Sequence, residues 1–158
     1  MKQITAAEAL NRAASYCTLC ERCISEVSNK LTVWGVEIKV QQDIIKRLID
    51  ENFINEERYS KAFVNDKIRF NHWGRKKISA ALYEKRISKS IIGNAIATID
   101  EEEYNEILHK VLSAKHKELK YREDNSTRQK LLRFAASRGF ETQLIIKALK
   151  ISNDEMDF

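Results

Sequence analysis

The sequence predicts an all-α protein made of three tandem three-helix repeats, which form an elongated, curved array. Three observations predict this fold class. The 158 residues include no proline and only four glycines, and proline is the residue that most strongly ends or kinks a helix. Apolar residues recur with the helical period of 3.6, which gives nine candidate helices. The same apolar positions return three times along the chain, at spacings of 51 and 53 residues.

The first repeat, residues 1–53, is expected to hold helices over residues 5–17, 23–34 and 40–51. Thr5 and Glu8 match a capping box, in which the threonine caps backbone amides and the glutamate reaches back to the start of the helix. Gly35 follows the second helix, where glycine readily adopts the left-handed conformation that ends a helix. The third helix carries an apolar stripe of Val40, Ile44, Ile45 and Leu48.

The second repeat, residues 54–99, is expected to hold helices over residues 55–70, 75–85 and 88–99. Asn55 is a suitable N-cap for the first of them. Arg86 stands where the other two repeats have Gly35 and Gly139. It must therefore adopt the left-handed conformation at some cost, or avoid it.

The third repeat, residues 100–150, is expected to hold helices over residues 100–119, 126–137 and 142–150, followed by an acidic tail over residues 151–158. Acidic residues from Asp100 to Glu103 stand at the start of its first helix. There they complement the positive end of the helix dipole, so we interpret them as helix-stabilising rather than catalytic.

The repeat register is fixed by Val36, Ile87 and Phe140, each just after the second helix of its repeat. Around them, apolar residues recur at equal distances in five sets: Val27, Ile78, Leu131; Leu31, Leu82, Ala135; Val40, Ile91, Leu144; Ile44, Ala95, Ala148; and Ile45, Ile96, Leu149. This pattern predicts a modular array in which each repeat buries a small core and neighbouring repeats cover each other's remaining apolar faces.

All three cysteines lie in the stretch YCTLCERC, at a spacing that also occurs in iron–sulfur proteins. On one straight helix, Cys17 and Cys23 would be about 9 Å apart along the axis. Thiolates bind a metal at about 2.3 Å, so three of them on such a helix cannot share one ion. A ferredoxin-like site also needs a fourth cysteine, which the chain lacks. We therefore expect Cys17, Cys20 and Cys23 to fill a helix junction.

The remaining motifs give no support for catalysis. The three histidines form no pair four residues apart, and the chain has no phosphate loop, dinucleotide fingerprint or nucleophile elbow. The sequence thus predicts no catalytic residue, no metal site and no cofactor. The N-terminal stretch has no continuous apolar core, which argues against a secretory signal or a membrane span and favours the cytoplasm.

Positive charge is concentrated in the middle of the chain. The net charge is +5, and nine basic residues between Lys61 and Lys89 are opposed only by Asp66 and Glu84. A charge excess of this kind fits either an acidic or polyanionic partner or a solvated helix surface. Three basic residues, Arg75 to Lys77, begin a helix, where they oppose its dipole and so do not serve helix stability.

These considerations give nine candidate binding residues. The strongest candidates are the basic residues at the start of the helix expected over residues 75–85. The weaker candidates include the basic residues at the end of that helix and those at equivalent positions in the third repeat. The full set is Arg75, Lys76, Lys77, Lys85, Arg86, Lys89, Arg128, Lys130 and Arg138. Trp73, just before this helix, could stack on a nucleic acid base, but we favour a role in covering the junction between helices.

Three stretches resemble the RecX family of bacterial regulators of the RecA recombinase. Residues 53–88 are similar to the family's turn, aromatic–alanine helix, glycine and basic helix, and residues 131–145 to its C-terminal Arg-Gly-Phe element. Residues 9–31 more weakly resemble its N-terminal repeat. Asn55, Ser60 and Arg86 depart from the residues usual in the family, namely Asp, Ala and Gly.

The resemblance implies an all-helical repeat protein that lodges in the groove of the RecA–DNA filament. It would limit filament growth and the ATPase, strand-exchange and coprotease activities of RecA, within DNA repair, recombination and the SOS response. The implied partners are the RecA filament and the single-stranded or duplex DNA inside it, with no membrane. A ligand of a filament has no need to self-associate, so we expect a monomer.

Two other classes of function remain open from the residues. Each three-helix unit could act as a helix-turn-helix-like module that binds DNA directly, through the same basic helix. An enzyme is the third class, but no set of residues supports it.

Overall fold

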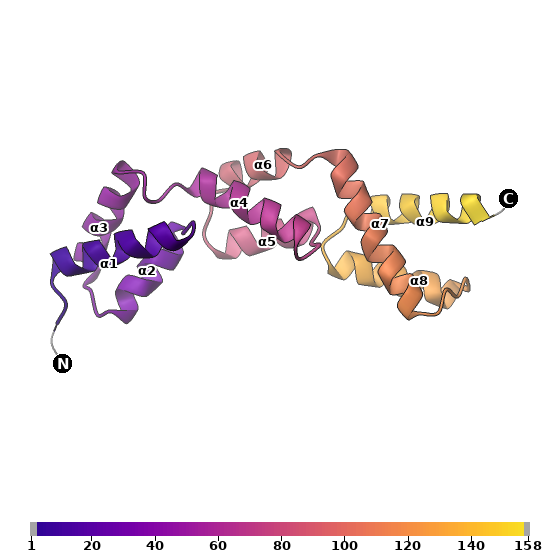
Figure 1. Ribbon diagram of the computed structural model, residues 1–158, viewed down its shortest axis with the longest axis horizontal. Helices are drawn as coiled ribbons and strands as arrows, with labels where there is room; N and C mark the ends of the chain where they lie inside the picture. Colours follow the sequence, from indigo (N-terminus) through magenta and orange to yellow (C-terminus); the bar gives the residue numbers. More distant parts are fainter. Residues whose placement is uncertain (1–2, 157–158) are drawn as a thin grey trace. The chain divides into compact units, whose positions relative to one another are not determined.

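The chain folds into helices joined by short connections. The computed structural model describes residues 3–156, with side chains described for residues 3–150. Within these residues it contains nine α-helices and no strand (Figure 1), which confirms the predicted all-α class. The chain divides into two compact units, Met1–Ala62 with Leu82–Ala95 and Phe63–Ala81 with Ile96–Phe158.

The first unit contains helices α1 (Ala6–Leu19), α2 (Ile24–Val33) and α3 (Ile38–Asp50). Each of the three contacts the other two. Their apolar faces enclose a core of small and medium side chains, namely Ala9, Ala13, Val27, Leu31, Ile44, Leu48 and Ile54. Two alanines in α1 let the other helices approach it closely.

The three middle helices contribute residues to both units. They are α4 (Glu56–Arg69), α5 (Arg75–Glu84) and α6 (Lys89–Ala97), and the boundary between the units falls inside each of them. The boundary between the two units therefore does not coincide with the boundaries between the predicted repeats. Each unit combines one outer repeat with the part of the middle repeat that packs on it. The repeat limits 1–53, 54–99 and 100–150 stay a prediction.

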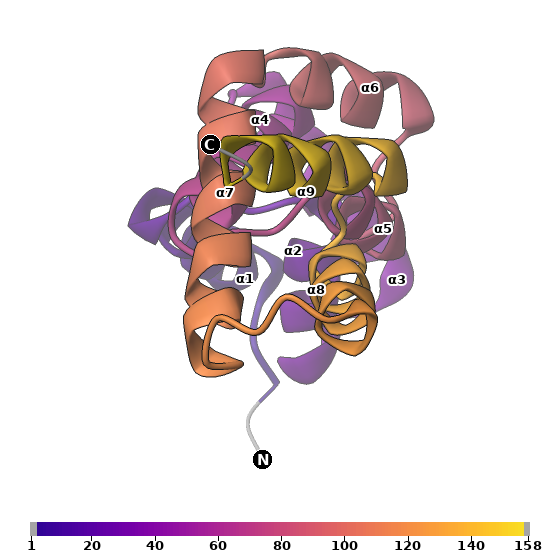
Figure 2. The same cartoon turned by 90° about the vertical axis from the view of Figure 1, so that its right-hand side faces the viewer.

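The second unit is completed by helices α7 (Glu101–Glu118), α8 (Asn125–Ser137) and α9 (Thr142–Met156), which all contact one another. In Figure 2, α7 runs from top to bottom and α9 runs from side to side. The ring of Phe140 packs on that of Tyr104, with centroids 5.2 Å apart. The backbone of α9 continues to Met156, whereas the side chains of the predicted acidic tail, residues 151–158, lie outside the described residues.

Polar side chains define where the helices begin. The Glu8 amide donates to Thr5 Oγ1 at 3.1 Å, and the Arg58 amide donates to Asn55 Oδ1 at 3.0 Å. Both predicted N-caps are thereby confirmed. Asp100 caps α7 in the same way, through the Glu103 amide at 2.9 Å.

Left-handed residues end the second helix of every repeat. The φ angles are +78° at Gly35, +64° at Arg86 and +97° at Gly139. Arg86 thus adopts the conformation that its position requires, although a side chain disfavours it by about 1–2 kcal/mol. The main chain keeps the same path at all three positions despite the difference in sequence.

Burial repeats in the predicted register. The sets that begin with Val27, Leu31 and Ile44 are buried in all three repeats, and the sets that begin with Val40 and Ile45 are half-buried in all three. One further buried position was missed, since it holds Gln41 in the first repeat and Ile92 and Ile145 in the others. The Gln41 side-chain amide donates to the Val36 carbonyl at 2.8 Å and to Thr32 Oγ1 at 3.1 Å, which satisfies the buried group.

Candidate partner-binding site at the repeat joints

Successive repeats are joined at two places, which we call joints. One joint lies within the first unit and the other lies within the second unit. In the first joint, the start of α2 meets α4 and the turn after α5, all in the first unit. In the second joint, the start of α5 meets α7 and the turn after α8, all in the second unit. The candidate binding residues are distributed around these joints.

The second joint is closed by direct contact between main chains. The Gly74 amide donates to the Arg138 carbonyl at 2.7 Å, and the Lys76 amide donates to the Gly139 carbonyl at 3.0 Å. The amides at the start of α5 thus meet the carbonyls at and just beyond the C-cap of α8, so the positive end of one helix dipole lies beside the negative end of the other. This contact explains how α5 tolerates a basic start, because carbonyl oxygens lie beside it.

Arg75 is committed to the interior of the second joint. Its guanidinium pairs with Glu101 and with Glu141, the latter at 3.0 Å, and lies 4.0 Å from the centroid of the Tyr104 ring. Only 20% of its side chain is exposed. Arg75 thus has a structural role that the sequence analysis did not expect, since two carboxylates inside the chain neutralise its charge; its place among the partner-binding candidates stays a prediction.

Tyr104 completes this network. Its hydroxyl donates to Glu141 Oε1 at 2.8 Å and accepts the Arg75 amide at 3.0 Å. Burial raises the pKa of Tyr104 well above its usual value, so the hydroxyl stays protonated as a donor. Such a network fixes the geometry of the joint and leaves α5 firmly oriented.

Trp73 lies beneath two ammonium groups at the same joint. Lys77 Nζ is 4.5 Å and Lys67 Nζ 4.7 Å from the centroid of its ring. The Trp73 amide also donates to the Lys67 carbonyl at 3.0 Å, just beyond the end of α4. The ring thus holds two positive charges close together by cation–π attraction.

A basic surface results from these contacts. Lys76 is exposed, and Arg138 is half-buried with its guanidinium 5.3 Å from the centroid of the Phe134 ring. We call the group the Trp73 surface; it consists of Lys67, Trp73, Lys76, Lys77 and Arg138. Phe70, three residues before Trp73, is 79% exposed and adds an apolar group to the same segment.

The other candidates lie elsewhere. Arg128 and Lys130 are exposed near the start of α8, about 12–15 Å along the helix from Arg138. Lys85, Arg86 and Lys89 belong to the first unit, and Lys85 Nζ lies 3.7 Å from Glu26 Oε1. The structure therefore brings together Lys76, Lys77 and Arg138 but not the full set of nine.

Sequence reasoning missed Lys67 and Phe70 as members of this region. Lys67 contacts Trp73 only because the chain turns back after α4, where His72 has a φ of +55°. The excess of basic residues in this stretch was a signal for Lys67. Phe70 could have been noticed as an aromatic residue outside the apolar register.

The first joint encloses a cavity of about 440 Å³. Its wall includes Glu26 on α2, Glu56 on α4, Glu84 at the end of α5 and the turn residues Lys85 and Arg86. The Ile24 amide, at the start of α2, donates to Glu56 Oε2 at 3.3 Å. Three glutamates, Glu26, Glu56 and Glu84, thus line the first joint, whereas basic residues gather at the second.

The cysteines do not form one cluster. Helix α1 ends at Leu19, Cys20 is extended and exposed, and Cys23 is the buried N-cap position of α2. The prediction that all three fill a junction is therefore wrong for Cys20, because the chain leaves the helix there. Burial raises the pKa of the Cys17 and Cys23 thiols. Within the described part of the chain, no group of three or more metal-ligating side chains is found.

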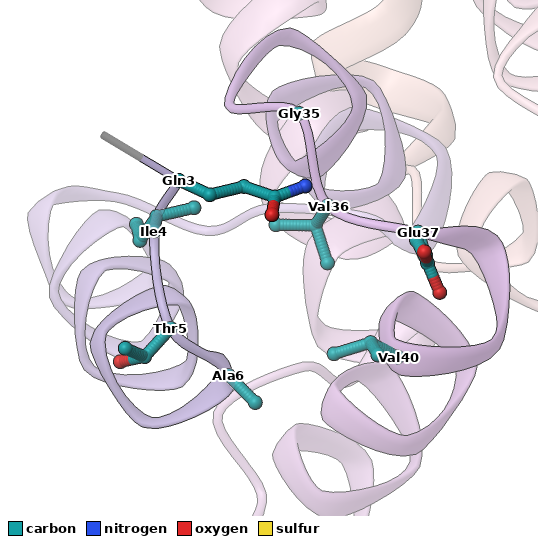
Figure 3. Close-up of a pocket in the computed structure, with 8 residues that line it drawn as sticks. All are labelled: Gln3, Ile4, Thr5, Ala6, Gly35, Val36, Glu37 and Val40. Carbon is teal, nitrogen blue, oxygen red and sulfur yellow. The ribbon is translucent and has the colours of Figure 1, made fainter. Parts of the chain in front are cut away.

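A smaller hollow opens beside α1 in the first unit (Figure 3). Residues Gln3 to Ala6 form one side of it, and Gly35, Val36, Glu37 and Val40 form the other. Its volume is about 170 Å³, which is below the usual range of ligand sites, roughly 300–1,000 Å³.

None of the described helices combines the length and the apolar character that crossing a bilayer requires.

Comparison with known proteins places this architecture in a family. Residues 55–96 match the model of the second three-helix domain of RecX, and residues 101–149 match that of the third. The chain belongs to the RecX family.

Named relatives and solved structures agree with this assignment. The chain is 35% identical over 121 residues to the "Regulatory protein RecX" of Clostridium perfringens strain SM101, which covers 73% of this chain and 54% of that protein. It is 27% identical over 160 residues to the protein of the same name from Lactobacillus johnsonii, covering 94% and 56%. The chain thus spans about half the length of the curated relatives it matches.

The fold itself is that of a solved RecX. A crystal structure of RecX from Lactobacillus salivarius is similar with a TM-score of 0.82, over 92% of this chain and 94% of that chain, at 21% identity. The likeness confirms the helical repeat fold of three-helix domains that the internal periodicity predicts.

Proposed function

We propose that this protein regulates the RecA recombinase by binding the RecA–DNA filament, and that its main effect is inhibition of the recombinase, ATPase and coprotease activities. Membership of the RecX family is the observation that carries the proposal. The regulator acts by binding alone, as a cytoplasmic monomer without catalytic residues or cofactor.

The Trp73 surface is the proposed contact with the filament. It gathers the ammonium groups of Lys67 and Lys77 on one ring, with the exposed Lys76 next to them. Preorganised positive charge suits both of the acceptors that a RecA–DNA filament offers, acidic protein surface and DNA phosphate. The exposed ring of Phe70 supplies an apolar contact, of the kind that often contributes most to affinity at an interface.

Arg128 and Lys130 form a second proposed contact. A protein with several binding modules gains affinity for a polymer of repeating subunits, because each bound module raises the local concentration of the next. Lys85, Arg86 and Lys89 remain weaker candidates; Lys85 is already paired with Glu26.

The test is the DNA-dependent ATPase of RecA with added protein, together with co-sedimentation on preformed filaments. We expect turnover to fall when the protein approaches a stoichiometric ratio to RecA, and the protein to sediment with the filament. Unchanged turnover combined with protein left in the supernatant would reject the proposal.

Direct DNA binding is the second candidate function, favoured by the pairing of two lysines with an aromatic ring at the Trp73 surface. It predicts tight binding to duplex DNA without RecA, with a steep salt dependence set by several phosphate contacts. Weak binding in a gel at moderate salt would leave the filament as the partner.

A further inference from the structure

The two joints have equivalent parts, but one lacks a cation that the other contains. Ile24 occupies in α2 the repeat position that Arg75 occupies in α5, and Glu56 begins α4 as Glu101 begins α7. In each joint, the backbone amide of the first residue of α2 or α5 donates a hydrogen bond to a side chain of the following repeat. Ile24 donates to Glu56 Oε2 at 3.3 Å, and Arg75 donates to the Tyr104 hydroxyl at 3.0 Å.

The second joint shows what this arrangement can bind. There the Arg75 guanidinium lies between Glu101 and Glu141 and against the Tyr104 ring. An arginine is suited to such a place, because its planar fork satisfies carboxylates in fixed directions and its face stacks on an aromatic ring.

In the first joint, the corresponding carboxylate has no cation. Glu56 accepts the Ile24 amide, and within residues 3–150 it forms no ion pair. Burial raises the pKa of Glu56, and the hydrogen bond from the Ile24 amide opposes this shift. Two basic residues, Lys85 and Arg86, also line the cavity; Lys85 is paired with Glu26, and Glu56 forms an ion pair with neither.

Space for a side chain exists because the main chains stay apart. The second joint is closed by Gly74 against Gly139, and the equivalent positions in the first joint hold Cys23 and Arg86. Side chains at both positions prevent the same close approach. The cavity of about 440 Å³ is the result, and its size lies within the usual range of binding sites.

We propose that the cavity of the first joint binds an arginine side chain presented by a partner protein, with Glu56 as its principal acceptor. The incoming guanidinium takes the place that Arg75 has in the second joint, beside Glu56. Glu84 also lines this cavity, whereas the repeat position of Glu141 holds Ser88. This site is separate from the Trp73 surface and does not depend on the proposed RecA function.

The experiment uses the full chain, amide-resolved NMR and N-acetyl-arginine amide as the probe. We expect saturable shifts of the Ile24, Ser25 and Lys85 amides, and none with N-acetyl-norleucine amide. Glu56→Gln keeps an acceptor for the Ile24 amide but should weaken probe binding at least about tenfold, as expected when a charge-assisted hydrogen bond is lost. Glu57→Gln, at the exposed neighbouring position, is the matched control and should bind as the parent does.

A self-filled variant provides an independent test. Ile24→Arg supplies the missing guanidinium and should abolish the probe-induced shifts. Absence of saturable shifts in the parent, equal binding by Glu56→Gln, or retained binding by a folded Ile24→Arg variant would each overturn the proposal. Since RecA is not present, these outcomes are independent of the filament assay.

Discussion

Gly74 and Gly139 touch through their main chains, and a Cβ atom added to Gly74 would lie 2.3 Å from the Gly139 carbonyl carbon. The Gly74→Ala variant must therefore displace the turn after α8. We expect a loss of about 1–3 kcal/mol in the free energy of unfolding, as for other overpacked sites. Urea titration followed by circular dichroism measures it.

Gly93 provides the control for that substitution. It lies in α6 with nothing within 4 Å of a Cβ position, so Gly93→Ala should raise stability by about 0.5–1 kcal/mol. Equal effects of the two variants would show that the close contact is not rigid.

Arg75→Met tests the internal role of Arg75. Removal of the guanidinium leaves Glu141 without its cation in a half-buried place, and we expect a loss of about 1–3 kcal/mol in stability. Thermal unfolding at low and high salt measures the loss. A variant as stable as the parent would contradict this structural role.

Lys76→Glu tests the Trp73 surface without disturbing the joint, since Lys76 contributes only its amide to the contact with Gly139. We expect weaker inhibition of the RecA ATPase, by about tenfold in the concentration required, with an unchanged unfolding temperature. Lys110→Glu makes the same charge change at an exposed position of α7 and should inhibit normally. Equal inhibition by both variants would exclude this surface.

Buried tyrosines predict a loss of stability at alkaline pH. Burial raises the pKa of Tyr59 and Tyr104 in the folded protein, whereas unfolded tyrosine ionises near pH 10. Below pH 10 both states keep the proton; above it only the unfolded state loses it, so stability falls as the pH rises. The expected slope is up to about 1.4 kcal/mol per pH unit for each tyrosine. Tyr104→Phe should flatten the decline in urea titrations across this range, with Tyr83→Phe at an exposed position as the control.

The thiols should react at different rates. Cys20 is exposed, Cys17 is half-buried and Cys23 is buried with a raised pKa. We expect one fast-reacting thiol in the folded protein and all three after unfolding, measured with a disulfide reagent and peptide mapping. Cys20→Ser should remove the fast phase, and its persistence would contradict the placement of Cys20.

Local features of the fold could be predicted because they depend on neighbouring residues. Thr5 and Asn55 were identified as caps from residue type and position. The equivalence of Arg86 to Gly35 and Gly139 raised the left-handed conformation as one of two alternatives, and the structure decides for it. The buried register emerged from periodicity alone. Gln41 escaped because a glutamine breaks the apolar pattern, while its hydrogen bonds to Thr32 and Val36 allow it to be buried.

The joints could not be predicted in the same way. Arg75 meets Glu141 across 66 residues of sequence, and no local pattern relates them. A charge that opposes the helix dipole was therefore interpreted as a binding residue, although α8 supplies the compensating carbonyls. Lys67 and Trp73 likewise come together only once the turn after α4 has formed.

Part of the second joint is held by atoms that every amino acid possesses, the main-chain amides of Gly74 and Lys76 and the main-chain carbonyls of Arg138 and Gly139. The side chain of Lys76 consequently carries no structural duty there. As long as both glycines remain, exposed residues of α5 such as Lys76 can be substituted without disrupting the joint. The residues that contact a partner can therefore change during evolution while the fold stays the same.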